Sequence, residues 1–240
     1  MKPVRFVVLS SPRTGSSLFV EALHQHPAIY CHGEIFHEMS EWHIRPEFIE
    51  KIGIGERQEN GIKFAYSILN FSNGCAAVGF KMWIFQHKDA CMALLGDPNV
   101  KKIILKRDNK LAMFASEQLA ISTGIWDVVP GVPIDKFREK NKAKFMRQAF
   151  LGFVDHQAAL FDSYRQHAVG DVLEIEYSDV ANLRLGPIFT LLNVESVPLH
   201  ATKQRIYSAD IMSRFEPQYS DEIKEVLAEI GKQNWAAEDL

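Results

Sequence analysis

The sequence is poor in cysteine and has no long apolar segment. Three cysteines, Cys31, Cys75 and Cys91, are spread over 240 residues, and no CxxC pair occurs. An odd, widely spaced set argues against a disulfide framework and against a zinc ribbon. No run of 18 apolar residues is present, which argues against a membrane span, and the chain shows no secretory signal pattern. These absences predict a protein of a reducing, cytoplasmic compartment.

Concentrated positive charge is missing as well. Lysine and arginine number 27 against 30 acidic residues, the formal net charge is -3, and no dense basic block occurs. This balance argues against a nucleic-acid partner and leaves room only for a local anion site. No repeat or low-complexity segment interrupts the chain. With 47% hydrophobic residues the chain can bury a sizeable core, and a single domain over residues 1–240 is expected.

What the sequence does contain is an alternation of short apolar runs and helical patterns. The strand-like runs are residues 4–9, 76–80, 102–106 and 172–177. They lack clean polar alternation, as is typical of strands covered on both faces in a parallel sheet. Helices are predicted near residues 16–25, 109–123, 135–167, 180–193 and 220–230, the last with Ser220 as N-cap. The fold class is therefore predicted to be α/β, with a parallel sheet flanked by helices.

The first of these strands leads into the turn SSPRTGSS, which is rich in groups that bind anions. The N–H groups at a helix N-terminus carry about half a positive charge and favour a phosphate-like ligand. Gly15 allows the backbone to approach a ligand closely, and Arg13 adds a planar cation. Further hydroxyl donors come from Thr14, Ser16 and Ser17. The turn could also be a plain strand–helix connection with small capping residues and no binding role. The density of hydrogen-bond donors in these eight residues favours an anion site.

This turn is not a Walker A loop. A Walker A loop reads GxxxxGK[ST], whereas the sequence around Gly15 has no second glycine and no lysine. ATP hydrolysis is therefore poorly supported, and the anion is held by a different set of groups.

The same turn, followed by HGEIF at residues 32–36, resembles the 5'-phosphosulfate loop of the PAPS-dependent sulfotransferases. The resemblance is closest to the bacterial carbohydrate group, which includes trehalose 2-sulfotransferase and the nodulation-factor sulfotransferases. It implies a P-loop NTPase-like sulfotransferase fold, no metal, and 3'-phosphoadenosine-5'-phosphosulfate (PAPS) as the donor. The residues that match the phosphosulfate loop by position are Arg13, Thr14, Gly15, Ser16 and Ser17.

A second segment is similar to the 3'-phosphate site of that family. Residues 101–120 read as a strand that ends near Arg107 and a helix that carries Ser116. The two residues are nine positions apart, whereas cytosolic relatives usually show eight. The resemblance implies that Arg107 and Ser116 together hold the 3'-phosphate.

Three further segments match the family more weakly. In residues 77–86 a strand ends near Lys81, which the resemblance places beside the transferring sulfuryl group, although a solvated strand-end lysine is an equal alternative. Residues 174–180 resemble the family's late strand and the turn after it. Residues 200–217 resemble the loop that covers the nucleotide. This loop offers candidate contacts to phosphate or adenine from Lys203, Gln204 and Arg205.

Sulfuryl transfer to an alcohol also needs a base for the hydroxyl proton. The stretch from His24 to His43 is rich in histidine and glutamate, but it contains no HExxH or other compact zinc spacing. Glu34 stands where the resembled bacterial group carries its catalytic glutamate. His32 is its nearest rival, because histidine serves as base in the cytosolic branch. Arg13 and Lys81 complete the predicted catalytic set, and the expected acceptor is a small molecule or glycan, most simply a carbohydrate or glycolipid hydroxyl.

Two other functions remain open. A nucleotide-dependent small-molecule kinase with a degenerate P-loop would need Mg²⁺ and a Walker-like lysine. A non-catalytic anion-binding module would hold the desulfonated nucleotide without any transfer. The resemblance is compatible with a homodimer, and residues 127–137 read as a loop or lid.

Overall fold

The structure is a computed structural model that describes residues 2–55, 57, 59–126, 140–200 and 209–238. Contacts between residues divide the chain into two compact units. The first consists of Met1–Lys106 and Phe161–His200, and the second of Arg107–Leu160 and Ala201–Leu240. Each unit has a hydrophobic core of its own, and the single domain expected over residues 1–240 stays a prediction.

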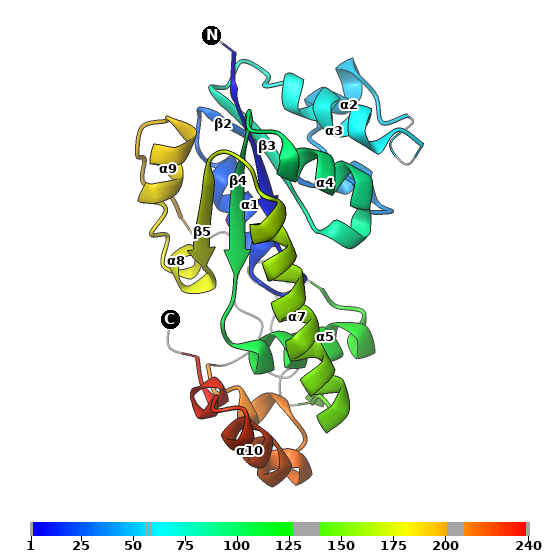
Figure 1. Ribbon diagram of the computed structural model, residues 1–240, viewed down its shortest axis with the longest axis vertical. Helices are drawn as coiled ribbons and strands as arrows, with labels where there is room; N and C mark the ends of the chain where they lie inside the picture. Colours follow the sequence, from blue (N-terminus) through cyan, green and yellow to red (C-terminus); the bar gives the residue numbers. More distant parts are fainter. Residues whose placement is uncertain (1, 56, 58, 127–139, 201–208, 239–240) are drawn as a thin grey trace. The chain divides into compact units, whose positions relative to one another are not determined.

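Five parallel strands form the centre of the first unit (Figure 1). They are β1 (Val4–Leu9), β2 (Ile29–Glu34), β3 (Ala77–Met82), β4 (Val100–Lys106) and β5 (Val172–Glu176). Their order in the sheet is β2-β3-β1-β4-β5, and all neighbouring pairs are parallel. This confirms the predicted α/β fold with a parallel sheet flanked by helices. Of the five strands, only β2 was not predicted. Its sequence IYCHGE ends in polar residues and glycine, so it does not form an apolar run.

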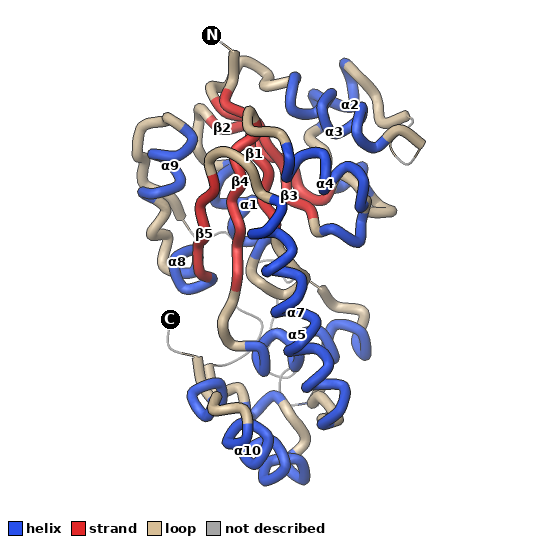
Figure 2. The backbone as a smooth tube through the Cα atoms, in the orientation of Figure 1, coloured by secondary structure: helices blue, strands red, loops and turns tan. Residues whose placement is uncertain are grey.

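Helices cover both faces of this sheet (Figure 2). They are α1 (Ser16–His24), α2 (Pro46–Lys51), α3 (Gly61–Asn70), α4 (Lys88–Gly96), α8 (Tyr177–Ala181) and α9 (Gly186–Leu192). Side chains of α1, α8 and α9 share a core with Phe6 and Val8 of β1. On the other side of β1, Arg5 donates a hydrogen bond to Asn70 of α3. Residues 6–9 are fully buried, as the unbroken apolar run of this strand predicts.

The prediction of one continuous helix over residues 180–193 is wrong. Two short helices, α8 and α9, occupy this stretch. Between them Leu183 has a φ of 53°, a left-handed conformation that an α-helix cannot contain.

The second unit contains α5 (Lys110–Thr123), α10 (Ser220–Glu229) and most of α7 (Arg147–His167). The observed α5 agrees with the predicted helix. Its N-terminus is capped by the Asn109 side chain, which accepts a hydrogen bond from the N–H of Ala112, and it ends at Gly124 with a φ of 71°. The core of this unit is rich in aromatic rings, among them Phe114, Phe145, Phe150, Phe215 and Trp235.

Two helix starts differ from the sequence prediction. Within the predicted stretch 135–167, the helix α7 begins at Arg147, and the described residues 141–146 before it are not helical, with Ala143 pairing with Phe215 in a parallel β-bridge. In α10 the N-cap is Tyr219, and Ser220 is already the first helical residue. None of the described helices has the length and apolar character that a membrane crossing requires.

Candidate active site

The loop between β1 and α1 has a backbone conformation suited to an anion. Arg13 has a φ of 65° and Gly15 a φ of 84°, both in the left-handed region. Thr14 lies between them, fully buried, and its Oγ1 donates to the carbonyl of Ser11 at 2.8 Å. Turns that mix left-handed residues with right-handed or helical ones form anion-binding concavities lined by N–H groups. The chain enters α1 directly from this turn, where the first N–H groups of the helix have no partner within the helix.

Gly15 is required in this loop for two independent reasons. Its positive φ disfavours any residue with a side chain. In addition, a Cβ at this position would lie 2.5 Å from the ring of Tyr177, the first residue of α8. The Tyr177 ring therefore covers the loop, a contact that nothing in the sequence pattern indicates.

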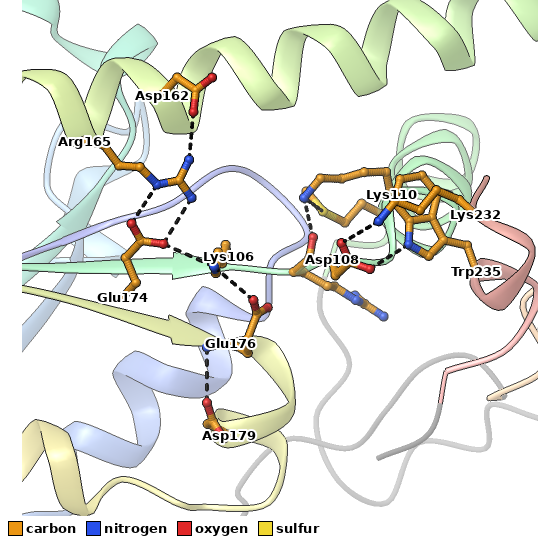
Figure 3. A network of polar contacts seen from close by, with 12 residues as sticks. Lys106, Asp108, Lys110, Asp162, Arg165, Glu174, Glu176, Asp179, Lys232 and Trp235 are labelled. Atoms are coloured by element: carbon orange, nitrogen blue, oxygen red, sulfur yellow. Dashed lines mark hydrogen bonds and ion pairs between the residues drawn. The ribbon is translucent and has the colours of Figure 1, made fainter. Parts of the chain in front are cut away.

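Polar contacts hold the corner of the chain that carries this ring (Figure 3). The Asp179 carboxylate accepts a hydrogen bond from the N–H of Glu176 at 3.3 Å, which fixes the start of α8. Lys106, at the end of β4, pairs with Glu174 at 3.2 Å and with Glu176 at 3.3 Å. Arg165 binds Glu174 from the other side through two N–H groups. The end of β4 is thereby tied to the end of β5, directly before Tyr177 in the chain.

Glu34 and Lys81 are partners across neighbouring strands. The register of the parallel pair β2 and β3 aligns Glu34 with Lys81, and His32 with Phe80. Gly33 is skipped in this register and forms a bulge. Because successive residues of a strand point to opposite faces, the bulge turns Glu34 to the face opposite that of His32.

Lys81 connects the Glu34 carboxylate to the loop. Its Nζ lies 2.8 Å from Oε1 of Glu34 and donates to the hydroxyls of Ser17 at 2.9 Å and Ser16 at 3.4 Å. The Lys81 side chain is 4% exposed, whereas that of Glu34 is 23% exposed. The ammonium is thus enclosed between carboxylate and hydroxyl oxygens, while the carboxylate remains accessible to a substrate.

Gln86 holds the other oxygen of the same carboxylate. Its Nε2 donates to Oε2 of Glu34 at 2.6 Å, and its Oε1 accepts from the N–H of Trp83 at 3.2 Å. Gln86 ends the short 3-10 helix η2 (Ile84–Gln86), which follows β3. No motif singles it out in the sequence, so its role could not be predicted.

The surroundings of Glu34 favour its ionised form. Burial by itself raises the pKa of this carboxyl, but the charge and hydrogen bond of Lys81 act against burial, and His43 and His37 reinforce that effect. The net result is a pKa below the ordinary value for glutamate.

His32 is separated from this cluster and is fully buried. Its Nδ1 accepts a hydrogen bond from the N–H of Arg45 at 3.1 Å, and its ring meets Tyr30 and Phe48 edge-on at centroid distances of 4.8 and 5.9 Å. Burial, together with the charge of Arg45, lowers the pKa of His32 to about 3. A neutral ring enclosed in this way has no access to an acceptor hydroxyl, so the geometry favours Glu34 over His32 as the base.

Two other histidines from the stretch between His24 and His43 lie beside Glu34. The rings of His37 and His43 are 4.8 Å apart. The bulge at Gly33 brings His43 close, since the Gly33 N–H donates to the His43 carbonyl at 2.7 Å and a Cβ there would lie 2.9 Å from Nδ1 of His43. Within the part of the chain that the structure describes, no three His, Cys, Asp or Glu side chains form a candidate metal site.

Arg107 and Ser116 belong to the second unit, where both are buried. Arg107 contacts the Glu238 carboxylate at two points, with Nε donating to Oε1 at 2.7 Å and Nη2 donating to Oε2. This two-point geometry also suits a phosphate. Ser116 lies on α5. The 3'-phosphate role of these two residues stays a prediction.

The segment that carries Glu238 is anchored inside the second unit. The indole Nε1 of Trp235 donates to Asp108 at 2.9 Å (Figure 3). The Asn109 amide donates to the carbonyls of Trp235 and Ala237, both at 3.0 Å. These contacts hold the Glu238 carboxylate where Arg107 meets it.

Four sequence predictions concern residues that the structure does not describe. They are the proposed nucleotide contacts Lys203, Gln204 and Arg205 and the loop or lid at residues 127–137. These assignments stay predictions.

No protein-family model matches the sequence, and a search of curated proteins finds no match. Among solved structures, a sulfotransferase from Alicyclobacillus acidocaldarius is similar with a TM-score of 0.48 and 15% identity, covering 100% of this chain and 98% of that chain. The mouse sulfotransferase SULT7A1, solved in complex with PAP, has a TM-score of 0.46 and 13% identity, covering 95% of this chain and 84% of that chain.

Proposed function

We propose that this protein is a PAPS-dependent sulfotransferase that transfers the sulfuryl group to a hydroxyl of a carbohydrate or glycolipid acceptor. The observation that carries the proposal is the buried Lys81 ammonium, which contacts both the anion-type loop and the Glu34 carboxylate. Donor site and base are thus joined by one side chain. This is the arrangement that an in-line transfer from an anionic donor to an alcohol requires.

The loop residues fit the phosphosulfate end of the donor. Gly15 gives the turn its left-handed backbone beneath the Tyr177 ring, and Ser16 and Ser17 begin α1 with hydroxyl and N–H donors. Arg13 contributes a guanidinium from the same turn. The 3'-phosphate is assigned to Arg107 and Ser116 on the sequence resemblance.

The reaction needs one proton transfer and one displacement at sulfur. PAPS supplies the sulfuryl group, whose bond to the 5'-phosphate oxygen breaks as the bond to the acceptor oxygen forms. Glu34 takes the acceptor's hydroxyl proton. Charge that develops on the leaving phosphate is stabilised by Lys81, by Arg13 and by the N–H groups of the loop. The products are the sulfated acceptor and 3',5'-bisphosphoadenosine, which keeps the bonding electron pair.

Lys81 has a second effect in this scheme. In the protein alone it keeps Glu34 ionised but also weakens it as a base. A bound phosphosulfate competes with Glu34 for the ammonium and adds negative charge nearby, so donor binding raises the basicity of the carboxylate. The base would thereby become effective when the donor is in place.

The first test is a thermal-shift comparison of 3',5'-bisphosphoadenosine, ATP and NAD at the same concentration, because a ligand at about 100 times its dissociation constant adds about 2.7 kcal/mol of stability, whereas a ligand far below its dissociation constant adds almost none. Stabilisation at micromolar 3',5'-bisphosphoadenosine, with ATP and NAD far weaker, supports the proposal. Preference for ATP with Mg²⁺ would favour the kinase instead.

Turnover is tested next, with radiolabelled PAPS and a panel of glycans. Transfer that survives EDTA treatment is expected. Tight binding of 3',5'-bisphosphoadenosine with no transfer to any acceptor would favour the non-catalytic anion-binding module.

A further inference from the structure

We infer that Gln86 is a positioning residue that orients the Glu34 carboxylate for proton transfer, an inference that rests on the proposed function for its catalytic consequence. Glu34 has two carboxylate oxygens, and each meets a different donor: Lys81 at Oε1 and Gln86 at Oε2. A carboxylate held at both oxygens cannot rotate freely. The lone pairs that remain point in directions set by these two contacts.

The orientation of the Gln86 amide follows from its two partners. An ionised carboxylate only accepts hydrogen bonds, and the Trp83 N–H only donates. The amide nitrogen must therefore face Glu34 and the amide oxygen must face Trp83, and both contacts are made in that orientation. The side chain is fixed at both ends of its amide, which is the condition for a residue that orients another.

The backbone that carries Gln86 is itself fixed to the start of the anion loop. The fully buried Tyr164 accepts a hydrogen bond from the Ile84 N–H at 3.1 Å, at the start of η2. The same hydroxyl donates to the carbonyl of Ser10 at 3.0 Å, directly after β1. A continuous path of hydrogen bonds therefore runs from the loop through Tyr164 and η2 to Gln86 and Glu34. This path sets the position of the base relative to the loop.

Gln86 also favours the charged form of Glu34, because it donates to the ionised carboxylate. The charged and titratable groups that face Glu34 are Lys81, on β3, and His37 and His43, which follow β2. Gln86 is the neutral member of this set. A change at Gln86 alters the charge around Glu34 only if the variant residue is itself charged.

Two substitutions distinguish the loss of the hydrogen bond to Glu34 from the loss of both hydrogen bonds of the Gln86 amide. Gln86→Glu keeps an oxygen for the Trp83 N–H but replaces the donor to Glu34 by a second carboxylate. Gln86→Met has similar length and removes both contacts. Gln25→Glu is the charge-matched control, because it adds the same charge to the first unit while the Gln25 side chain contacts the backbone of His200.

The first readout does not depend on activity: a ¹³C NMR titration of the Glu34 side chain in the full chain. We expect its midpoint to rise by about one pH unit or more in Gln86→Glu and by a smaller amount in Gln86→Met. Gln25→Glu should leave it unchanged. An identical Glu34 midpoint in wild type and both Gln86 variants would overturn the inference whether or not the protein transfers sulfate.

The second readout is turnover with PAPS. In Gln86→Met, kcat should fall about 10-fold or more, while KM for the donor changes by less than about twofold. In Gln86→Glu the acid limb of the rate profile should also move to higher pH. Normal kcat in a folded Gln86→Met overturns the positioning role. Wild-type protein that transfers nothing overturns the proposed function instead, and the NMR titration still decides whether Gln86 controls Glu34.

Discussion

The Glu34 carboxylate and the Lys81 ammonium lie 2.8 Å apart at the carboxyl ends of two neighbouring parallel strands. Ligands of open α/β sheets bind at this end of the strands. The pair is therefore placed where a substrate is expected. Its carboxylate could contact an acceptor hydroxyl and its ammonium an anionic donor, and in the protein alone the two charges neutralise each other. The predictions below test what these two residues and their neighbours do.

Replacement of Glu34 by glutamine should abolish most of the turnover without changing the fold. Glu34→Gln keeps the shape of the side chain and removes its basicity, so kcat should fall by about 10²- to 10⁴-fold. Affinity for 3',5'-bisphosphoadenosine, measured by calorimetry, should stay close to that of wild type.

His32→Asn is the matched control for Glu34→Gln. Because His32 is buried among Tyr30 and Phe48, its loss should lower the thermal midpoint but leave most of the rate per folded molecule. An inactive but folded His32→Asn beside an active Glu34→Gln would reverse the assignment of the base.

The pH dependence should differ between the free enzyme and the donor complex. The profile of kcat/KM reports the free enzyme, and its acid limb should lie at lower pH than an ordinary glutamate would give, since Lys81 lowers the pKa of Glu34. The profile of kcat reports the complex, and there the anionic donor should shift the limb upward. Lys81→Met should raise the limb of kcat/KM above that of wild type, and an unchanged limb would mean that Lys81 does not control this group.

The same ion pair gives the stability a predictable pH dependence. Because the folded-state pKa of Glu34 is lowered, the pair stabilises the fold above the unfolded-state value, and this contribution is lost as the pH falls through the folded-state value. Urea unfolding of wild type and Lys81→Met should therefore differ more at neutral pH than under strongly acidic conditions.

Arg107 should recognise the 3'-phosphate. Arg107→Ala is expected to weaken binding of 3',5'-bisphosphoadenosine by about 1.5 to 3 kcal/mol, the range for a charged hydrogen bond, with little change for adenosine 5'-monophosphate. Glu238→Gln should instead tighten binding of the bisphosphate, because Glu238 occupies the same guanidinium. Equal loss of thermal stability in both variants with unchanged nucleotide affinities would show that Arg107 serves only to hold Glu238.

A methyl group at Gly15 should lower the stability of the protein more than a methyl group at a glycine that has the same φ but open space around it. Gly53 also has a φ of 84°, but no atom lies within 4 Å of the place its Cβ would take. Gly53→Ala should therefore cost only about 1 to 2 kcal/mol for the left-handed conformation. Gly15→Ala adds a collision with Tyr177 and should lose more stability and, measured by calorimetry, most of its nucleotide affinity. Equal stability losses in the two variants would remove Tyr177 from the loop's support.

The sequence by itself determined the fold class and the tight turn between the first strand and the first helix. Mainly apolar runs such as residues 4–9 predict strands covered on both faces, and Gly15 among small hydroxyl residues predicts a tight turn at a helix start. These features are readable because backbone conformation and hydrophobic period depend on residues close together in the chain. The helix over 109–123 and its end at Gly124 belong to the same class.

Only the tertiary structure decided which side chains meet. The bulge at Gly33 sends Glu34 and His32 to opposite faces of the sheet, so two residues that the sequence left as rivals have different surroundings. Gln86 and Tyr177 reach the site from segments far apart in the chain, and the sequence assigned a role to neither side chain. Strand register and the contacts of side chains far apart in sequence arise from packing of the whole sheet, which no local pattern encodes.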